Sequence, residues 1–195
     1  MFNVMLDKLP TEYKGYPINS DFRIGIQMFQ AISGNELSEM EKMSKACELL
    51  FDVDGVEEYP DMATMWEGVQ WFLSDWYTDN PVKGKEEQKK DMDYDIDQWR
   101  IFSAFLTQFG INLNTVDMHF WVFMGLLSTL EECAFTRIVD IRTKKIDPKM
   151  KPSDKKELRE IKERYALEDV KEQLTPQEKA EYDNFMKYAK KGIKQ

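Results

Sequence analysis

The stretch from Asp91 to Arg142 constrains the fold more than any other part of this 195-residue chain. It opens with four aspartates at alternate positions and continues into two segments in which apolar and aromatic residues recur every three or four positions. This recurrence places apolar side chains on one side of an α-helix, so the stretch predicts successive packed helices. It contains no recognisable catalytic set, which favours a protein of assembly over an enzyme.

The same spacing predicts helices along the rest of the chain. The expected elements are a small hairpin within residues 9–18, helices near 21–33, 35–51 and 62–76, a helix from Asp93 or Asp95 to the stop at Gly110, a helix from Asn114 or Thr115, and a helix over 133–143. In the fourth helix one face carries Ile96, Trp99, Phe102, Leu106 and Phe109. The predicted fold class is mainly α, a helical bundle of about six to eight helices with a small N-terminal β-hairpin.

Two prolines, Pro148 and Pro152, forbid a continuous helix between residues 146 and 152. They divide the chain into an expected helical core domain over residues 1–145, which includes the hairpin, and a proline linker with a C-terminal helical hairpin over 146–195. Ser153 is the expected cap of the first of these late helices. The capping-box pattern from Thr175 to Glu178 opens the second.

The charge of the chain excludes nucleic acid as the expected main partner. The net charge is −9, and binding to phosphates requires Lys and Arg to displace counterions. The sign is uneven along the chain: residues 1–143 hold 12 Lys and Arg against 25 Asp and Glu, whereas residues 144–195 hold 15 against 11. An acidic body with a mildly basic tail is therefore expected.

Membrane insertion and export are not expected either. The longest apolar run, Phe120 to Leu127, is far shorter than the roughly 18 residues that a membrane-spanning helix needs. The N-terminal segment lacks the pattern of a signal peptide. Cys47 and Cys133 both lie in apolar helical patterns, which favours buried thiols in a reducing compartment over the weaker alternative of a disulfide.

No pattern of metal ligands or nucleophiles in the sequence is convincing. The aspartates at positions 91, 93, 95 and 97 suggest a calcium loop, but Ile96 stands where the turn needs glycine and Phe102 where a bidentate glutamate is required. His119 is the only histidine, so a multi-histidine zinc site cannot form, and a packed histidine is the favoured interpretation. We therefore expect no enzymatic activity, no cofactor and no bound metal.

The twelve methionines and the aromatic stripes leave two interpretations open. Methionine-rich surfaces can accommodate varied hydrophobic helices, since the side chain is flexible and polarisable. Ordinary core filling is the favoured explanation for each residue taken singly. Together they still predict apolar surface on which another helix could dock.

A series of short motifs resembles the bacteriophage gene-product-fifteen family of siphophage and prophage tail clusters. They are Asp93-Tyr94-Asp95-Ile96-Asp97, Ala104-Phe105, Phe109-Gly110-Ile111-Asn112-Leu113, His119-Phe120-Trp121, Phe123, Leu126-Leu127, Ile138 and Ile141-Arg142, with Tyr16 to Arg23 upstream and Glu163 to Leu167 downstream. The resemblance covers most of the chain up to Leu167. Asn112 stands where an aspartate is expected, and Phe120 where a second tryptophan is common.

The resemblance implies a tail assembly chaperone that binds the phage tape measure protein, in the cytoplasm of the infected or lysogenic bacterial host. The expected binding surface is built from the helices over residues 61–77 and 95–130, and the oligomeric state is left open. A minor structural component retained in the tail is the alternative, and a metal-binding acidic cluster is the weakest one. Asp95, His119, Trp121 and Arg142 are the candidate partner-binding or motif residues, with a structural pairing of Arg142 and Asp95 as one specific expectation.

Overall fold

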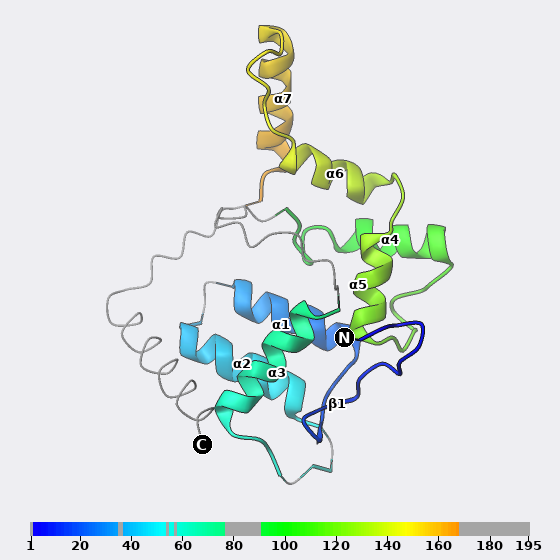
Figure 1. The fold of residues 1–195 in the computed structure, drawn as a ribbon. Helices are drawn as coiled ribbons and strands as arrows, with labels where there is room; N and C mark the ends of the chain where they lie inside the picture. The colour runs from blue at the N-terminus through cyan, green and yellow to red at the C-terminus, as the bar shows by residue number, and fades with distance from the viewer. Residues whose placement is uncertain (1, 35–36, 54, 57, 77–90, 168–195) are drawn as a thin grey trace. The chain divides into compact units, whose positions relative to one another are not determined.

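The computed structural model describes residues 2–34, 37–53, 55–56, 58–76 and 91–167 of the chain (Figure 1). Its elements are β1 Glu12–Tyr13, β2 Tyr16–Pro17, α1 Phe22–Ser33, α2 Glu39–Phe51, α3 Met62–Ser74, α4 Gln98–Phe109, α5 Phe120–Ser128, α6 Ala134–Thr143 and α7 Pro152–Tyr165. The expected mainly α class with an N-terminal hairpin is confirmed. The helix predicted from Thr175 lies outside the described residues. None of the described helices is both long and apolar enough to cross a membrane.

The described residues form two compact units that interleave along the chain. Unit 1 contains the residues up to 76 together with 117–125, and unit 2 contains 91–116 and 126–167. Helix α5 therefore begins in unit 1 and ends in unit 2. Whether residues 146–195 form a domain of their own stays a prediction.

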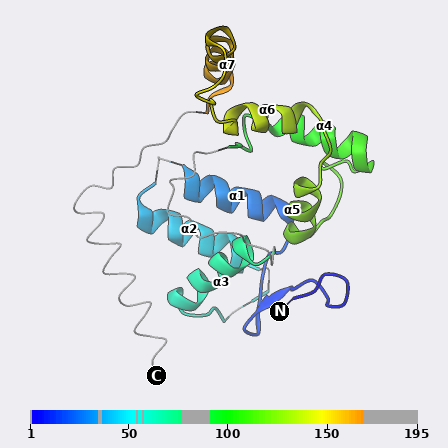
Figure 2. The ribbon, with the colours of Figure 1, turned by 45° about the horizontal axis from the view of Figure 1, so that its top comes forward.

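Unit 1 is a layer of helices around an aromatic core. Helices α1 and α2 run side by side, and α3 packs next to α2 (Figures 1 and 2). The side chains with essentially no exposed surface in this unit are Met28, Ala46, Cys47, Leu50, Phe51, Val69, Phe72, Phe120 and Phe123. Since burying a large apolar side chain contributes roughly 1.5–3 kcal/mol, this set is the main source of stability in the unit.

The first three helices begin where local capping chemistry predicts. Asp21 accepts the backbone N–H of Arg23 at 2.8 Å, and Ser38 forms a reciprocal capping box with Glu41 at the start of α2. Asp61 accepts the backbone N–H groups of Ala63 and Thr64, and the hydrogen bonds from Thr64 lower the pKa of Asp61. These side chains satisfy backbone donors that have no partner inside the helix.

Helix α4 begins later than the spacing predicted, at Gln98 instead of Asp93 or Asp95. The Asp93 carboxylate accepts the N–H groups of Asp95 and Ile96, so the aspartate run folds into a tight turn of its own before the helix starts. The predicted end is confirmed: Gly110 adopts the left-handed conformation, with φ 68°, and its N–H bonds back to the last turn.

Helix α5 also begins later, at Phe120 instead of Asn114 or Thr115. A short antiparallel bridge explains the delay, because Phe22 donates its N–H to Met118 and Phe120 donates its N–H to Ser20. This pairing requires extended backbone around His119, so the helix cannot begin before Phe120. Tertiary pairing therefore overrides the helical pattern that the sequence shows further upstream.

At helix α7 the expected cap is wrong: Lys151 is the N-cap and Ser153 lies inside the first turn. Pro152 is the first helical residue, where its missing N–H costs nothing. A proline also pushes the preceding residue into an extended conformation, and Lys151 has ψ 148°. The proline, not the serine, therefore sets the start of the helix.

Helices α1 and α5 approach closely at Gly25. A Cβ atom at this position would overlap the ring of Phe120, which is fully buried and stacks on Phe72 with ring centroids 5.2 Å apart. Because the ring is fully buried, a Cβ at Gly25 would force Phe120 or its neighbours to shift. Gly25 is thus required by packing, not by backbone conformation.

We expect Gly25→Ala to lower the free energy of unfolding by about 1–3 kcal/mol, the usual cost of overpacking a filled core. Urea denaturation of the full chain measures this loss. Gly125→Ala is the matched control, because no atom lies within 4 Å of a Cβ built there. In a helix interior that control should be neutral or stabilising by up to about 1 kcal/mol. Equal losses in the two variants would contradict the packing argument.

Candidate functional site

Unit 2 is organised around a carboxylate that has no contact with water. Asp97, the residue before α4, is fully buried. Its two oxygens receive Nη1 and Nη2 of Arg142 at 2.6 and 3.1 Å, and Nη1 of Arg100 at 2.8 Å. Such a paired, bidentate arrangement is what a buried carboxylate requires, since desolvation would otherwise disfavour its charge.

Arg142 extends this network to other parts of unit 2. Its Nε donates to the carbonyl of Tyr165 at 2.8 Å and its Nη1 to the carbonyl of Asp91 at 3.2 Å. The Nζ of Lys162 donates to the carbonyls of Arg142 and Lys144 at 2.8 and 2.6 Å, which places a cation at the C-terminal end of α6. One ion pair thus joins the aspartate turn, the start of α4, the end of α6 and the end of α7.

The predicted pairing of Arg142 with Asp95 is wrong in its partner: the carboxylate that receives Arg142 is Asp97. Asp95 is exposed, and its backbone N–H donates to Asp93. The turn that precedes α4 carries Asp97 inward, and Asp97 Oδ2 in turn accepts the N–H of Asp93 at 3.1 Å. Alternation of the aspartates did not identify which of them would be buried.

In unit 1, His119 connects two parts of the chain that are far apart in sequence. Its Nε2 lies 2.9 Å from the carbonyl oxygen of Pro10, and its Nδ1 accepts the backbone N–H of Trp121 at 3.0 Å. A carbonyl can only accept, so Nε2 carries the proton and the ring is neutral. His119 therefore caps α5 on one side and fixes the segment before the hairpin on the other. Burial lowers its pKa, opposed by the weaker effect of the Pro10 carbonyl.

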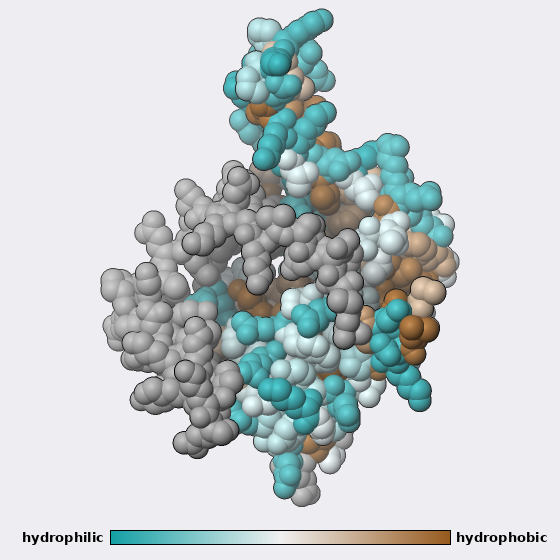
Figure 3. Space-filling model, in the orientation of Figure 1, coloured by the Kyte–Doolittle hydropathy of each residue, from teal (hydrophilic) through white to brown (hydrophobic). Residues whose placement is uncertain are grey.

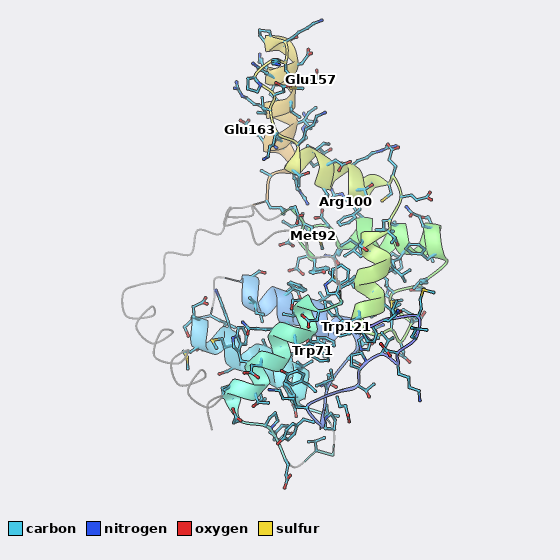
Figure 4. All side chains as sticks on the ribbon, viewed as in Figure 1. Trp71, Met92, Arg100, Trp121, Glu157 and Glu163 are labelled. Atoms are coloured by element: carbon cyan, nitrogen blue, oxygen red, sulfur yellow. The ribbon has the colours of Figure 1, made fainter. Side chains whose placement is uncertain are left out.

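Trp121 lies within an aromatic cluster of the same unit. Its indole N–H donates to the carbonyl of Phe72 at 2.8 Å, near the end of α3, where helix carbonyls lack partners. Edge-on contacts join its ring to Trp71 and Phe2, with centroids 5.2 and 4.9 Å apart. Figure 4 shows Trp71 and Trp121 next to each other, one from α3 and one from α5.

His119, Trp121 and Arg142 are therefore engaged within the chain, and their roles toward a partner stay predictions. Both cysteines are free; Cys47 is buried, which raises its thiol pKa to about 12, and Cys133 is partly exposed. Over residues 2–76 and 91–167, apart from the few internal gaps, no cluster of three His, Cys, Asp or Glu side chains could hold a metal ion. Within the described residues, the side chains of His119, Trp121 and Arg142 join segments that are far apart in sequence.

The face that the spacing assigned to Ile96, Trp99, Phe102, Leu106 and Phe109 is largely exposed at and just before α4. Ile96, Trp99 and Leu106 are 58, 71 and 44% exposed, and Phe102 lies between them with its ring edge-on to Trp99, 5.8 Å between centroids. We call these four residues the α4 stripe. The buried side of the helix is formed by Ile101, Ala104 and Phe105. Apolar residues reach the surface in the part of unit 2 that contains α4, whereas the visible face of α7 is mostly hydrophilic (Figure 3).

A sequence signal for this surface exists. Apolar residues occupy two sides of α4, more than a helix that packs on a single core needs. Only one of these sides can face the interior of a small unit. The apolar residues on the other side of α4 therefore suggest a second surface for contact.

We expect Asp97→Asn to lower the free energy of unfolding by about 3 kcal/mol or more, because it leaves buried Arg142 without a charged partner. Asp91→Asn is the control in the same aspartate run: Asp91 accepts Arg142 through its backbone carbonyl, which the substitution keeps, and its side chain is exposed. That variant should stay within about 0.5 kcal/mol of the parent chain. Denaturant unfolding of both variants measures the difference, and similar losses would remove the special role of Asp97.

The protonation of His119 should make the protein less stable in mild acid. Its folded-state pKa is lowered, so the unfolded chain takes up the proton first as the pH falls below about 6.5. The contribution is complete above that pH and is lost as the pH falls through the folded-state pKa. His119→Asn keeps an acceptor for the Trp121 N–H but cannot titrate. The stability advantage of the parent chain over this variant should shrink between about pH 7.5 and about 5.5; an unchanged advantage would contradict the assignment.

A family described as Bacteriophage Gp15 protein matches residues 5–167, which is most of the chain and includes the Asp97–Arg142 pair, His119 and the α4 stripe. No curated protein and no solved structure matches the chain. The chain belongs to the bacteriophage Gp15 family.

Proposed function

We propose that this phage protein is a non-enzymatic tail assembly chaperone that binds helices of the tape measure protein. The observation that carries the proposal is the α4 stripe: Trp99 is 71% exposed on a helix whose first residue follows a fully buried, doubly paired Asp97. Large exposed apolar residues that cluster on one helix are a common sign of a protein interaction site. The family membership indicates a phage protein, and the α4 stripe indicates which surface binds a partner.

The stripe has the form of a helix-binding surface. Ile96, Trp99, Phe102 and Leu106 recur at steps of three or four residues, which is the pattern that meets a partner helix along one line. Tryptophan is enriched among residues that dominate binding energy. Since the ion pair and the Gly110 cap hold both ends of α4, little conformational entropy is lost when a partner binds.

The acidic charge of the chain supports the same role. A net charge of −9 keeps copies apart and keeps a partner that carries several of them in solution. A tape measure protein is a long helical protein with apolar faces that lack a partner until the tail tube assembles. A chaperone with an apolar stripe on an acidic body would cover such faces reversibly, and the site of action would be the host cytoplasm.

The surface predicted from the sequence also included the helix over residues 61–77. In the structure the aromatic residues Trp71 and Phe72 of that helix are engaged in the unit 1 cluster, while Met62 at its start is exposed. Helix α4 therefore carries the more exposed large apolar side chains, Trp99 and Leu106, against Met62 on α3. We place the principal contact on α4.

Co-expression with the tape measure protein tests this function. The parent chain should raise the soluble fraction of the tape measure protein and co-purify with it, and Trp99→Ser should weaken that binding by roughly tenfold or more, as expected for loss of a central aromatic contact. Because Trp99 is largely exposed, its replacement should leave the unfolding transition of the free chain unchanged.

The matched control removes apolar surface elsewhere. Met5 and Leu6 are 87 and 81% exposed in a closed turn near the N-terminus. The double variant Met5→Ser/Leu6→Ser should bind as the parent does. A tape measure protein that is equally soluble with and without this chain would refute the proposed function, and equal loss in both sets of variants would show that general hydrophobicity, not the α4 stripe, is responsible.

A further inference from the structure

Helix α4 and the loop that follows it carry almost no charge. Residues 101–116 contain no Asp, Glu, Lys, Arg or His, although 32% of the chain is charged. Within α4 itself the one charged residue is Arg100, whose guanidinium is bound to Asp97. Several of the uncharged residues are nevertheless exposed, namely Ser103, Leu106, Thr107, Asn112 and Asn114. Depletion of charge on exposed surface is typical of the centre of a protein interface.

A second copy of this chain is the partner that this absence of charge favours. Each copy has a net charge of −9, so copies repel each other wherever acidic surface meets acidic surface. Along residues 101–116 that local repulsion is missing. A partner of opposite charge would instead be attracted to acidic surface, whereas an acidic copy of the same chain approaches best where no like charges are brought together.

The apolar residues of α4 are spaced so that the helix is complementary to a copy of itself. Trp99, Phe102, Leu106 and the partly exposed Phe109 follow one another at intervals of three, four and three residues. This is the spacing of apolar residues along the line of contact between two paired helices. The intervals read the same in both directions. Two antiparallel copies of α4 therefore place Trp99 opposite Phe109 and Phe102 opposite Leu106, and each contact occurs twice, as a two-fold axis requires.

The packing of unit 2 leaves this line of contact accessible. Helix α4 packs on α6 (Figures 1 and 2), and its buried residues are Ile101, Ala104 and Phe105. Trp99 and Leu106 are 71 and 44% exposed. Pairing of two copies through α4 therefore requires no rearrangement within unit 2.

We propose that two free copies of the chain pair through antiparallel α4 helices, as a closed two-fold dimer, until a client helix replaces the second copy. The replacement rests on the proposed function, but the pairing does not. A stable interface has roughly 20–30 residues a side, so a contact built on the α4 stripe is weak and reversible. At the low concentrations of an unfolding measurement the copies are separate. A client that binds only separate chains has its affinity reduced by the fraction that is paired.

Sedimentation velocity of the full chain over a range of concentrations tests the pairing. The parent chain should pass from monomer to dimer, and no further, as its concentration rises toward about 1 mM. Trp99→Ser should weaken self-association by roughly tenfold or more, because it removes the largest apolar side chain from the contact. Met5→Ser/Leu6→Ser removes exposed apolar surface outside the stripe and is the matched control, which should pair as the parent does.

Opposite charges at Ser103 test the two-fold geometry. Ser103 is exposed, lies four residues after Trp99 and three before Leu106, and is within one position of the centre of the contact line. The axis therefore brings the Ser103 residues of the two copies together. Ser103→Lys and Ser103→Glu should each weaken self-association by about two- to fivefold, since like charges then face each other. A mixture of these two variants should recover pairing at least to the level of the parent chain.

Three outcomes would overturn the proposal. They are a parent chain that stays monomeric at every concentration, assembly that continues beyond the dimer, and a mixture of the two Ser103 variants that pairs no better than either variant alone. None of them affects binding of the tape measure protein, so the proposed function would stand. A dimer that passes these tests, with no effect of the protein on tape measure solubility, would remove the proposed function and leave the pairing in place.

Discussion

A carboxylate buried away from water needs positively charged hydrogen-bond partners nearby. In unit 2 this requirement determines how three helices meet. Asp97 has no exposed surface, and the groups that compensate it come from α4 itself, through Arg100, and from the end of α6, through Arg142. Because Arg142 also binds the carbonyls of Asp91 and Tyr165, the pair fixes the aspartate turn and the end of α7 at once. A buried pair adds little net stability compared with apolar packing, but it tolerates few alternative arrangements. Its role is to specify one geometry for α4.

Unit 1 achieves similar specificity with neutral groups. The His119 ring accepts one backbone N–H and donates to one carbonyl, and the indole of Trp121 donates to a carbonyl that the end of α3 leaves without a partner. Each of these side chains satisfies backbone groups that would otherwise be buried without hydrogen bonds. His119, Trp121 and Arg142 are thus each bonded to other parts of the same unit. Residues that bind a partner must be sought among side chains that the fold leaves exposed.

The presence of the helices could be predicted from the spacing of apolar residues. Where several of them begin depends on other features, such as caps and tertiary pairing. The start of α1 and the end of α4 were predictable, because the capping aspartate Asp21 and the left-handed Gly110 are local signals. The start of α5 was not, because the pairing of residues 20–22 with 118–120 joins segments about a hundred positions apart. The choice of Asp97 over Asp95 as the partner of Arg142 has the same origin: alternate aspartates look equivalent until the turn at 93–97 directs one of them inward. The exposed side of α4 could not be distinguished from its buried side by spacing alone, since both are apolar.

That second apolar side is the feature that cohesion does not explain. If α4 served only to complete unit 2, a polar residue in place of Trp99 would cost the unit little, because Trp99 is 71% exposed. A large exposed apolar side chain on a rigid helix is also a liability, since it promotes association of free copies. The liability is acceptable only where something covers the surface for most of the lifetime of the protein. A client helix of the kind proposed above would do so, which makes exposure of Trp99 a transient state instead of a permanent cost.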